Sequence, residues 1–269
     1  MSNAKDHVGR VNVMKEEFGW EIPVELVPVP SKGLIYDAES SLYKKESVKI
    51  KAMTAREEDI LSSSALIKEG TVLDHLIDSC VLDDIDAKDM ILGDRNALML
   101  AIRITGYGPE YPVRAFCSSC NHENKFSIDL SQIPIRRLTI DPVEEGKNLF
   151  EYNLPVTKKK VLFKFATLRD DRERSFKEQS LKNHIKMMVE SKITGNLEVA
   201  IQQVDHVTDK NKIKHFIMNM PAFDSRSLRK FIQENEPGME MSCSFGCSNC
   251  GKQNTSAIPI TSDFFWPST

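Results

Sequence analysis

Two Cys-x-x-Cys pairs lie far apart in this chain of 269 residues, in tracts that resemble each other. Cys117 and Cys120 form the first pair, and Cys247 and Cys250 repeat it at an offset of 130 positions. Further residues match in the same register, namely Asp94 with Asp224, Leu98 with Leu228, Ile102 with Ile232, Asn124 with Asn254, and Ile128 with Ile258. Because similar tracts adopt similar structures, this internal repeat constrains the fold more than any single motif.

A second pair of matching tracts lies upstream, where Val48–Glu58 resembles Val161–Asp171 at an offset of 113. Apolar residues alternate in the first part of each tract, which predicts a β-strand. Each tract ends in Thr-x-Arg-acid-acid, so Thr54 and Thr167 are expected to cap helices that have acidic residues in their first turn. Glu57 lies three residues after Thr54, which predicts a capping box.

A later helix in each copy is expected to have an aspartate as its N-cap, Asp94 in the first and Asp224 in the second. The predicted order is then strand, capped helix, helical segment, capped helix, strand, cysteine turn and strand, and it occurs twice. From cap to cap the first copy spans 94 − 54 = 40 positions and the second 224 − 167 = 57. The second copy therefore carries an insertion of 17, which we place within the helical stretch Ser175–Met220.

These patterns predict an α+β fold of two pseudo-repeats joined by a split zinc ribbon with four cysteine ligands. Residues 1–24 are expected to be an N-terminal extension, and residues 25–140 the first repeat with its cysteine turn. Residues 141–148, which include a proline and a glycine, are the expected linker. Residues 149–269 are the expected second repeat, which ends in an aromatic tail.

Four cysteine thiolates can complete the tetrahedral shell that Zn²⁺ favours. Ordinary zinc ribbons place their two pairs about 15 to 20 residues apart, whereas Cys120 and Cys247 are separated by 247 − 120 = 127 positions. Two similar halves packed about a pseudo-twofold axis would bring the pairs face to face. The sequence therefore predicts one structural zinc ion per chain, with Cys117, Cys120, Cys247 and Cys250 as its ligands.

The alternatives for these pairs are redox-active thiols and cysteines that share no role. Redox pairs normally open a helix, but strand-like segments follow both pairs, most clearly Lys125–Leu130. His122 could replace a sulfur ligand, yet four thiolates already close the shell, so we expect this histidine in a solvent-facing loop. Structural zinc is the prediction that these observations favour.

Two cysteines remain outside the predicted metal site. Cys243 aligns with Val113, a strand residue, so it is predicted to be a buried or half-buried strand thiol. Cys80 lies in the apolar helical stretch Leu76–Leu82 and is predicted to be a core thiol.

The composition is that of a globular protein, with 41% hydrophobic and 28% charged residues. There is no run of about 18 apolar residues that could span a membrane. Met1–Arg10 lacks the apolar region of a secretion signal, so a cytoplasm that keeps thiols reduced is expected. The net charge of −3 lacks the basic excess of nucleic-acid binders, and Lys158–Lys160 is interpreted as a solvated turn. Protein partners are therefore favoured over membranes and nucleic acids.

Catalytic motifs are absent from the sequence: it has no GxSxG, P-loop, HExxH or dinucleotide-binding glycine pattern. A shell of four sulfurs leaves no open position for water or substrate on the metal. The acidic residues Glu57, Glu58, Asp170 and Asp171 are explained by helix capping. We therefore predict no catalytic and no cofactor-binding residues, and a protein that is not an enzyme.

Several short strings, taken in order, are similar to the T4-type bacteriophage baseplate family, whose members belong to, or help to assemble, the central hub of a contractile tail. The strings are Val29–Tyr36, Thr54–Leu61, Leu92–Arg95, Arg103–Gly108, Cys117–Cys120 and Asp263–Pro267. The likeness is clearest over residues 25–135. It implies a zinc-stabilised, non-enzymatic adaptor that docks other tail or baseplate hub proteins, with self-association left open. It also implies a location in the virion tail baseplate, or in the host cytoplasm during assembly.

Two segments are candidate docking elements. Ile22–Pro30 suits an edge strand because its prolines interrupt pairing, and Phe264–Trp266 suits an aromatic interface anchor. The alternative for each is that it packs on its own domain. A zinc-ribbon nucleic-acid-binding or transcription-associated factor is the second functional hypothesis, and a thiol-redox or metal-dependent enzyme is the third.

Overall fold

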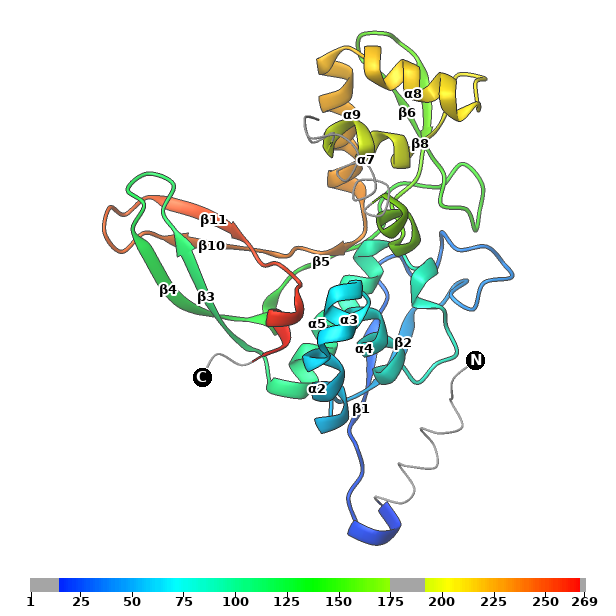
Figure 1. The fold of residues 1–269 in the computed structure, drawn as a ribbon. Helices are drawn as coiled ribbons and strands as arrows, with labels where there is room; N and C mark the ends of the chain where they lie inside the picture. Colours follow the sequence, from blue (N-terminus) through cyan, green and yellow to red (C-terminus); the bar gives the residue numbers. More distant parts are fainter. Residues whose placement is uncertain (1–14, 175–191, 267–269) are drawn as a thin grey trace.

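The computed structural model describes residues 15–174 and 192–266. The protein is α+β, and its strands form small antiparallel sheets. Figure 1 shows a central body, a second body of helices and strands above it, and two hairpins that project together to one side. Within the described ranges, no helix combines the length and the hydrophobicity needed to span a bilayer.

The first half folds around the long helix α5. Strand β1 (Val24–Pro28) pairs with β2 (Ser47–Lys51), and the buried side chains of Val48 and Ile50 in β2 belong to the same core as Leu98 and Ile102 of α5. The elements that complete this half are α2 (Ala55–Ser62), α3 (Ser64–Glu69), α4 (Val72–Cys80), η1 (Ala87–Asp89), α5 (Leu92–Tyr107), β3 (Glu110–Phe116), β4 (Glu123–Asp129), η2 (Leu130–Gln132) and β5 (Ile135–Arg136).

The second half is built on an antiparallel sheet in the order β6-β7-β8. Phe150 of β6 lies 4.7 Å from Phe165 between ring centroids and 5.6 Å from Phe163. The elements are β6 (Phe150–Asn153), β7 (Lys160–Phe163), α7 (Lys192–Ala200), β8 (Ile201–Val204), α8 (Lys210–Asn219), α9 (Ala222–Asn235), β9 (Gly238–Met239), β10 (Ser242–Gly246), β11 (Gln253–Ala257) and η3 (Ser262–Phe265).

The stretch expected to hold the insertion is not wholly helical. Residues 175–191 of this stretch lie outside the described residues. The remainder contains α7 and α8, but β8 runs between them and adds a third strand beside β7. The prediction of a continuous helical stretch was therefore wrong here. The physical reason is that β7 has a free edge with which a short segment can pair, and this segment buries Ile201 and Val204.

Thr54 caps α2 through the predicted capping box. Its N–H donates to Glu57 Oε2 at 2.9 Å, while Lys51 Nζ and Ser79 Oγ hold the other carboxylate oxygen at 2.7 and 2.5 Å. Burial raises the pKa of Glu57, but the bonds from Lys51, Ser79 and Thr54 outweigh burial, so the pKa lies below its usual value. The carboxylate thus stays charged inside the protein because it is fully paired.

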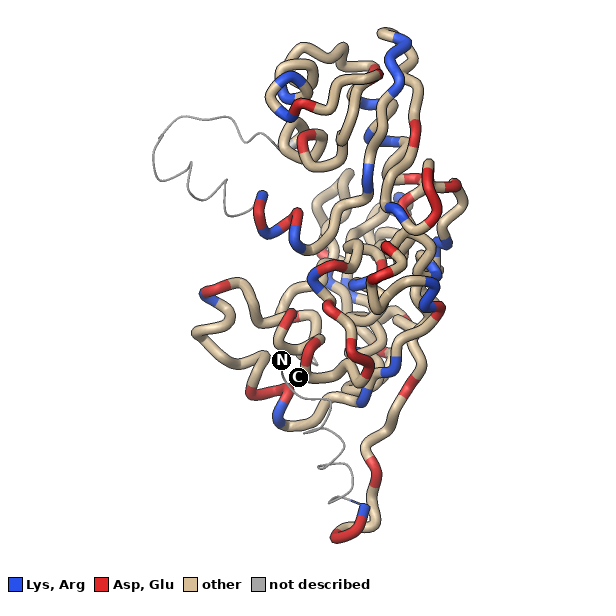
Figure 2. The backbone as a smooth tube through the Cα atoms, turned by 90° about the vertical axis from the view of Figure 1, so that its right-hand side faces the viewer, with Lys and Arg blue, Asp and Glu red and all other residues tan. Residues whose placement is uncertain are grey.

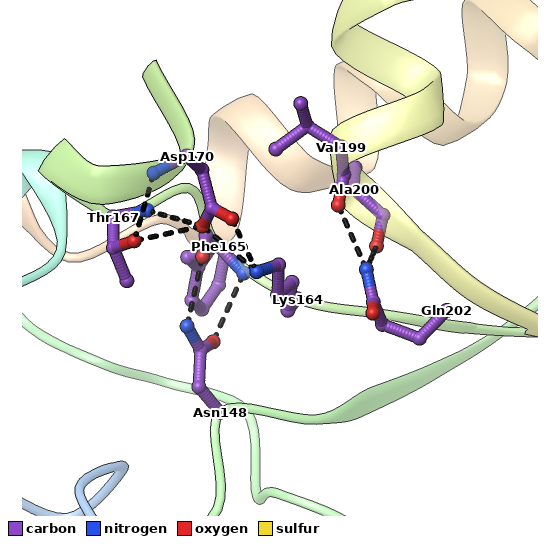
Figure 3. Close-up of polar contacts among 8 residues, drawn as sticks. All are labelled: Asn148, Lys164, Phe165, Thr167, Asp170, Val199, Ala200 and Gln202. Atoms are coloured by element: carbon purple, nitrogen blue, oxygen red, sulfur yellow. Dashed lines mark hydrogen bonds and ion pairs between the residues drawn. The ribbon is translucent and has the colours of Figure 1, made fainter. Parts of the chain in front are cut away.

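The second half has the same arrangement around a shorter acid, as Figure 3 shows. Thr167 N–H donates to Asp170 Oδ2 at 3.0 Å, and Lys164 Nζ lies 2.6 Å from Asp170 Oδ1. Asn148 braces the neighbouring strand end through both backbone groups of Phe165, at 2.8 and 2.9 Å. The strand, cap and first helical turn are thereby joined by polar contacts in both halves.

The later aspartates are not N-caps, which corrects the prediction for them. Ile91 and Pro221 occupy the N-cap positions of α5 and α9, and Asp94 and Asp224 are the third residues of these helices. Each carboxylate is buried and accepts hydrogen bonds from a distant turn instead. The physical reason is that a first-turn carboxylate also benefits from the helix dipole, and the fold brings a turn with free N–H groups to it.

The two turns make comparable contacts. Asp94 accepts from the Ser31 N–H at 2.8 Å and from the Tyr36 hydroxyl at 2.6 Å. Asp224 accepts from the N–H groups of Val156 and Thr157 at 2.7 and 3.0 Å. In each half the aspartate therefore ties the start of a helix to a turn that lies 58 to 68 residues earlier in the chain.

The halves meet closely at the start of α5. A Cβ atom added to Gly93 would lie 1.8 Å from the Pro237 carbonyl oxygen, so only glycine fits there. Leu92 N–H donates to the Ala166 carbonyl at 3.0 Å, and β5 of the first half pairs with β9 of the second. The two halves thus share backbone hydrogen bonds as well as a core.

The aromatic tail packs on its own chain. Phe264 and Phe265 in η3 are 1% and 0% exposed, and Trp266 is 37% exposed. The buried guanidinium of Arg103 donates to the Phe264 carbonyl at 3.1 Å and to the Gly108 carbonyl at 2.9 Å. The first two aromatic residues are thus part of the core, so the alternative of intramolecular packing holds for them.

We expect Phe265→Ala to lower the free energy of unfolding by about 3–5 kcal/mol, because it empties a fully buried aromatic site. Trp266→Ala is the comparison and should cost less, about 1 kcal/mol, because this side chain is more than a third exposed. Urea unfolding followed by circular dichroism measures both. Equal losses for the two variants would contradict this account of the tail.

Candidate metal centre

The four predicted cysteine ligands lie at the ends of two β-hairpins. Strands β3 and β4 form the first hairpin and β10 and β11 the second, both antiparallel. Between the hairpins lies a small apolar cluster of Val113, Ala115 and Phe245, and the Phe245 ring stacks on Phe126 at 5.1 Å. Figure 1 shows the hairpins side by side, directed away from the body.

The two cysteine turns have the same backbone hydrogen bonds. In the first, Cys117 N–H donates to the His122 carbonyl, and Asn121 N–H donates back to the Cys117 carbonyl, both at 3.0 Å. In the second, Cys247 N–H donates to the Lys252 carbonyl, and Gly251 N–H donates to the Cys247 carbonyl, both at 2.9 Å. Each turn thereby directs its two sulfurs toward the other hairpin.

The left-handed residue of each turn differs in type. Asn121 has φ 55° and Gly251 has φ 73°, and these are the residue types that adopt this conformation at the lowest cost. Both residues directly follow the second cysteine of their pair. In both turns, the residue after the second cysteine is therefore of a type that readily adopts the left-handed conformation that the turn requires.

The four sulfurs form one compact group, within 4.8 Å of one another. Cys117 Sγ lies 3.6 Å from Cys250 Sγ, and Cys120 Sγ lies 3.6 Å from Cys247 Sγ. A tetrahedral ion with Zn–S bonds of about 2.3 Å requires sulfurs about 3.8 Å apart, whereas a disulfide requires about 2.05 Å. The spacing therefore fits a tetrahedral metal ion and not a disulfide.

Two asparagines brace the sulfurs across the hairpin interface. Asn124 Oδ1 accepts from the Ser248 N–H at 2.9 Å, and Asn254 Oδ1 accepts from the Ser118 N–H at 3.0 Å. Asn254 Nδ2 also approaches Cys117 Sγ at 3.6 Å, and Asn124 Nδ2 approaches the Sγ of Cys247 at 3.8 Å. Both asparagine residues are buried, so each hairpin holds the opposite cysteine turn.

The thiols differ in acidity. The backbone N–H groups of Cys120 and Ser119 lower the pKa of Cys117 to about 6. The Lys252 N–H lowers the pKa of Cys250, but hydrogen bonds to the three neighbouring sulfurs, together with burial, raise it to about 12 overall. The Cys250 thiol thus keeps its proton as a donor to the neighbouring sulfurs, and a divalent cation at the centre would favour its loss.

The remaining cysteines and the His122 side chain are not members of this group. Cys243 pairs with Ser256 in the second hairpin, is half-buried, and has its pKa raised by burial. Cys80 is fully buried in α4, and burial raises its pKa to about 12. The His122 carbonyl accepts a hydrogen bond within the first turn, and His122 is an exposed residue. These positions agree with what the sequence predicted for them.

The bracing role of Asn124 and Asn254 was missed from the sequence. Their match at an offset of 130 was visible, but an asparagine in a strand gives no sign of its partner. A buried side-chain amide needs hydrogen-bond partners, so the paired asparagines beside paired cysteines were the available signal.

The protein is therefore an α+β chain with a candidate structural metal centre, formed where two hairpins bring four cysteines together. The family model described as T4 bacteriophage base plate protein matches residues 35–266, so the chain belongs to this family. This confirms the resemblance found in the short sequence strings. No curated protein and no solved structure matches the chain.

We expect Asn124→Ala to lower the free energy of unfolding by about 1–3 kcal/mol, because it leaves the Ser248 N–H without its acceptor in a partly buried site. Asn254→Ala should cost a similar amount through Ser118. Ser119→Ala is the control, since its exposed side chain can be removed while its N–H to Cys117 remains. Chemical denaturation measures the differences, and a control as costly as the asparagine variants would argue against the brace.

Proposed function

We propose that this protein is a zinc-stabilised structural or assembly component of the baseplate hub of a contractile phage tail, where it docks other baseplate proteins. The family match over residues 35–266 supports the baseplate role. The observation that carries the zinc part is the group of four cysteine sulfurs, contributed two by two from hairpins that are far apart in the sequence. Zinc would act here by fixing one hairpin against the other.

The proposal assigns one Zn²⁺ per chain to Cys117, Cys120, Cys247 and Cys250. Support comes from sulfurs 3.6 Å apart across the interface and from the preference of zinc for four thiolates in closed, structural sites. A closed shell has no free position for a reacting water, so the ion is assigned no catalytic part. The protein is accordingly proposed to be an adaptor and not an enzyme.

We further infer that the chain consists of two copies of one unit, over residues 25–140 and 149–269, joined by a linker at 141–148. The inference is supported by matching contacts: the Lys51–Glu57 pair has its counterpart in Lys164–Asp170 at an offset of 113. The two aspartates and the cysteine turns match as well, at an offset of 130. The turn residues that donate to the aspartates, Ser31 and Thr157, correspond at a slightly different offset of 157 − 31 = 126. In this interpretation the hairpins are related by a pseudo-twofold axis that passes through the metal.

Metal analysis tests the assignment of the ligands. We expect one zinc per wild-type chain, loss of the metal in Cys247→Ser, and retention in Cys243→Ser, because only the first removes a sulfur of the group. The melting temperature should fall in Cys247→Ser alone, since binding energy of a structural zinc contributes to folding. Plasma mass spectrometry on dialysed protein gives the ratio, and loss of zinc from Cys243→Ser with retention in Cys247→Ser would reverse the assignment.

Assembly of phage particles tests the biological role. In a phage that lacks a functional copy of this gene, we expect tail assembly to stop before a complete baseplate forms, as seen by electron microscopy. A plasmid copy should restore tails, Cys243→Ser should restore them equally, and Cys117→Ser should not. Normal baseplates without any copy would contradict the proposed role.

A further inference from the structure

Residues 15–28, termed here the N-terminal arm, expose an unusual amount of apolar surface. The arm consists of a helical turn at residues 15–18 and then β1. Figure 1 shows the turn below the central body and β1 leading up from it to lie beside β2, away from the two hairpins. Its large exposed side chains are Phe18 at 72%, Trp20 at 49%, Val24 at 51% and Leu26 at 65%. Four large exposed apolar side chains within one short segment make this arm a candidate interaction surface.

The backbone of β1 has an open edge. Val29 N–H donates to the Glu46 carbonyl at 2.8 Å, and Ala52 N–H donates to the Pro23 carbonyl at 2.9 Å, so the odd-numbered residues of β1 bond to β2. In an antiparallel pair the alternate residues direct their N–H and C=O groups to the other side. Within the described part of the chain no strand lies on that side, since β1 and β2 form a two-stranded sheet. Among the described residues, Val24 and Leu26 therefore have no partner for the backbone groups on this side.

Strand β1 is anchored to the rest of the protein by a core side chain and by its pairing with β2. Val27 is 5% exposed and belongs to the main core, and β1 is paired with β2 along its whole length. Pro28 has no N–H, so a further strand could pair along Val24–Leu26 but not continue beyond Pro28 as regular sheet. Pro28 thus sets the C-terminal limit of the open edge.

The charge of the arm indicates the kind of partner. Residues 15–28 contain four glutamates, Glu16, Glu17, Glu21 and Glu25, and one lysine, Lys15. Lys15 pairs with Glu21, which leaves an acidic excess beside the apolar side chains, and Figure 2 shows the acidic positions along this part of the backbone. Like charges would oppose pairing of two such arms, whereas a basic strand would be attracted.

We propose that the open edge of β1 binds an extended segment of another protein, with alternating apolar and basic residues, which adds to the sheet as a third strand. Main-chain hydrogen bonds to Val24 and Leu26 supply the pairing, the exposed side chains of the arm supply apolar contact, and the glutamates select lysine or arginine. The proposal rests on the adaptor role proposed above for its biological meaning, but it does not require zinc.

A synthetic probe tests this directly in the full-length protein. The probe is a fluorescein-labelled nine-residue peptide that alternates valine with lysine, and its binding is followed by fluorescence anisotropy. We expect saturable binding that weakens as salt is raised. A peptide with glutamate in place of lysine, and one with a central proline, should each bind at least tenfold more weakly.

Two variants locate the binding. Leu26→Pro removes an N–H that points away from β2, so it should weaken binding about fivefold to tenfold while β1–β2 pairing is kept, which circular dichroism and the melting temperature check. Glu21→Lys/Glu25→Lys should weaken binding at least as much. Its matched control is Glu69→Lys/Glu234→Lys, which reverses two exposed acids in α3 and α9. Zinc content should remain that of the wild-type protein in all variants, so failure here is distinguishable from failure of the proposed zinc site.

Three results would overturn the proposal. The first is equal binding of the peptide to the wild-type protein, Leu26→Pro and the charge variant, or no binding to any of them. The second is a dimer, seen by sedimentation equilibrium, that Leu26→Pro converts to a monomer, because the occupant would then be a second copy. The third is binding that appears only after deletion of residues 1–14, because the chain itself would then cover the edge.

Discussion

The four cysteine sulfurs meet at the tips of two hairpins whose own shared core is small, limited to Val113, Ala115 and Phe245 with partly buried neighbours. So little apolar surface cannot by itself fix two hairpins that are separated by more than a hundred residues of chain. Polar contacts at the tips therefore add to the β5–β9 pairing at the base and fix how the two cysteine turns face each other. The asparagine–serine bonds set the turns, and the sulfurs lie at a spacing that suits one tetrahedral ion.

Buried polar groups have the same organising role in the rest of the protein. Asp94 and Asp224 tie helix starts to distant turns, and Arg103 ties the C-terminal segment to the end of α5. The two aspartates differ in electrostatics: burial raises the pKa of Asp94, whereas N–H donors from the turn hold that of Asp224 below its usual value despite burial. The same arrangement of contacts therefore surrounds one carboxylate with a raised pKa and one with a lowered pKa. Both can be buried because each accepts enough hydrogen bonds.

Local rules predicted the parts of the fold that depend on neighbouring residues. Thr54 and Glu57 formed the expected capping box, since both partners lie within one helical turn. Asp94 was expected to cap α5 for the same reason, but its partners Ser31 and Tyr36 lie some 60 residues away. A short sequence window cannot reveal such partners, and the strand β8 was missed because its existence depends on the free edge of β7.

The sequence by itself determined which cysteines come together, because the repeat assigned Cys247 and Cys250, and not Cys243, to the register of the first pair. It also determined the turn chemistry at each pair. Only the tertiary structure decided how the halves pack: Gly93 admits Pro237 and Gly238 to backbone contact, while its counterpart Phe223 is exposed. Close packing depends on the shape of both surfaces at once, and that information is not contained in either tract alone.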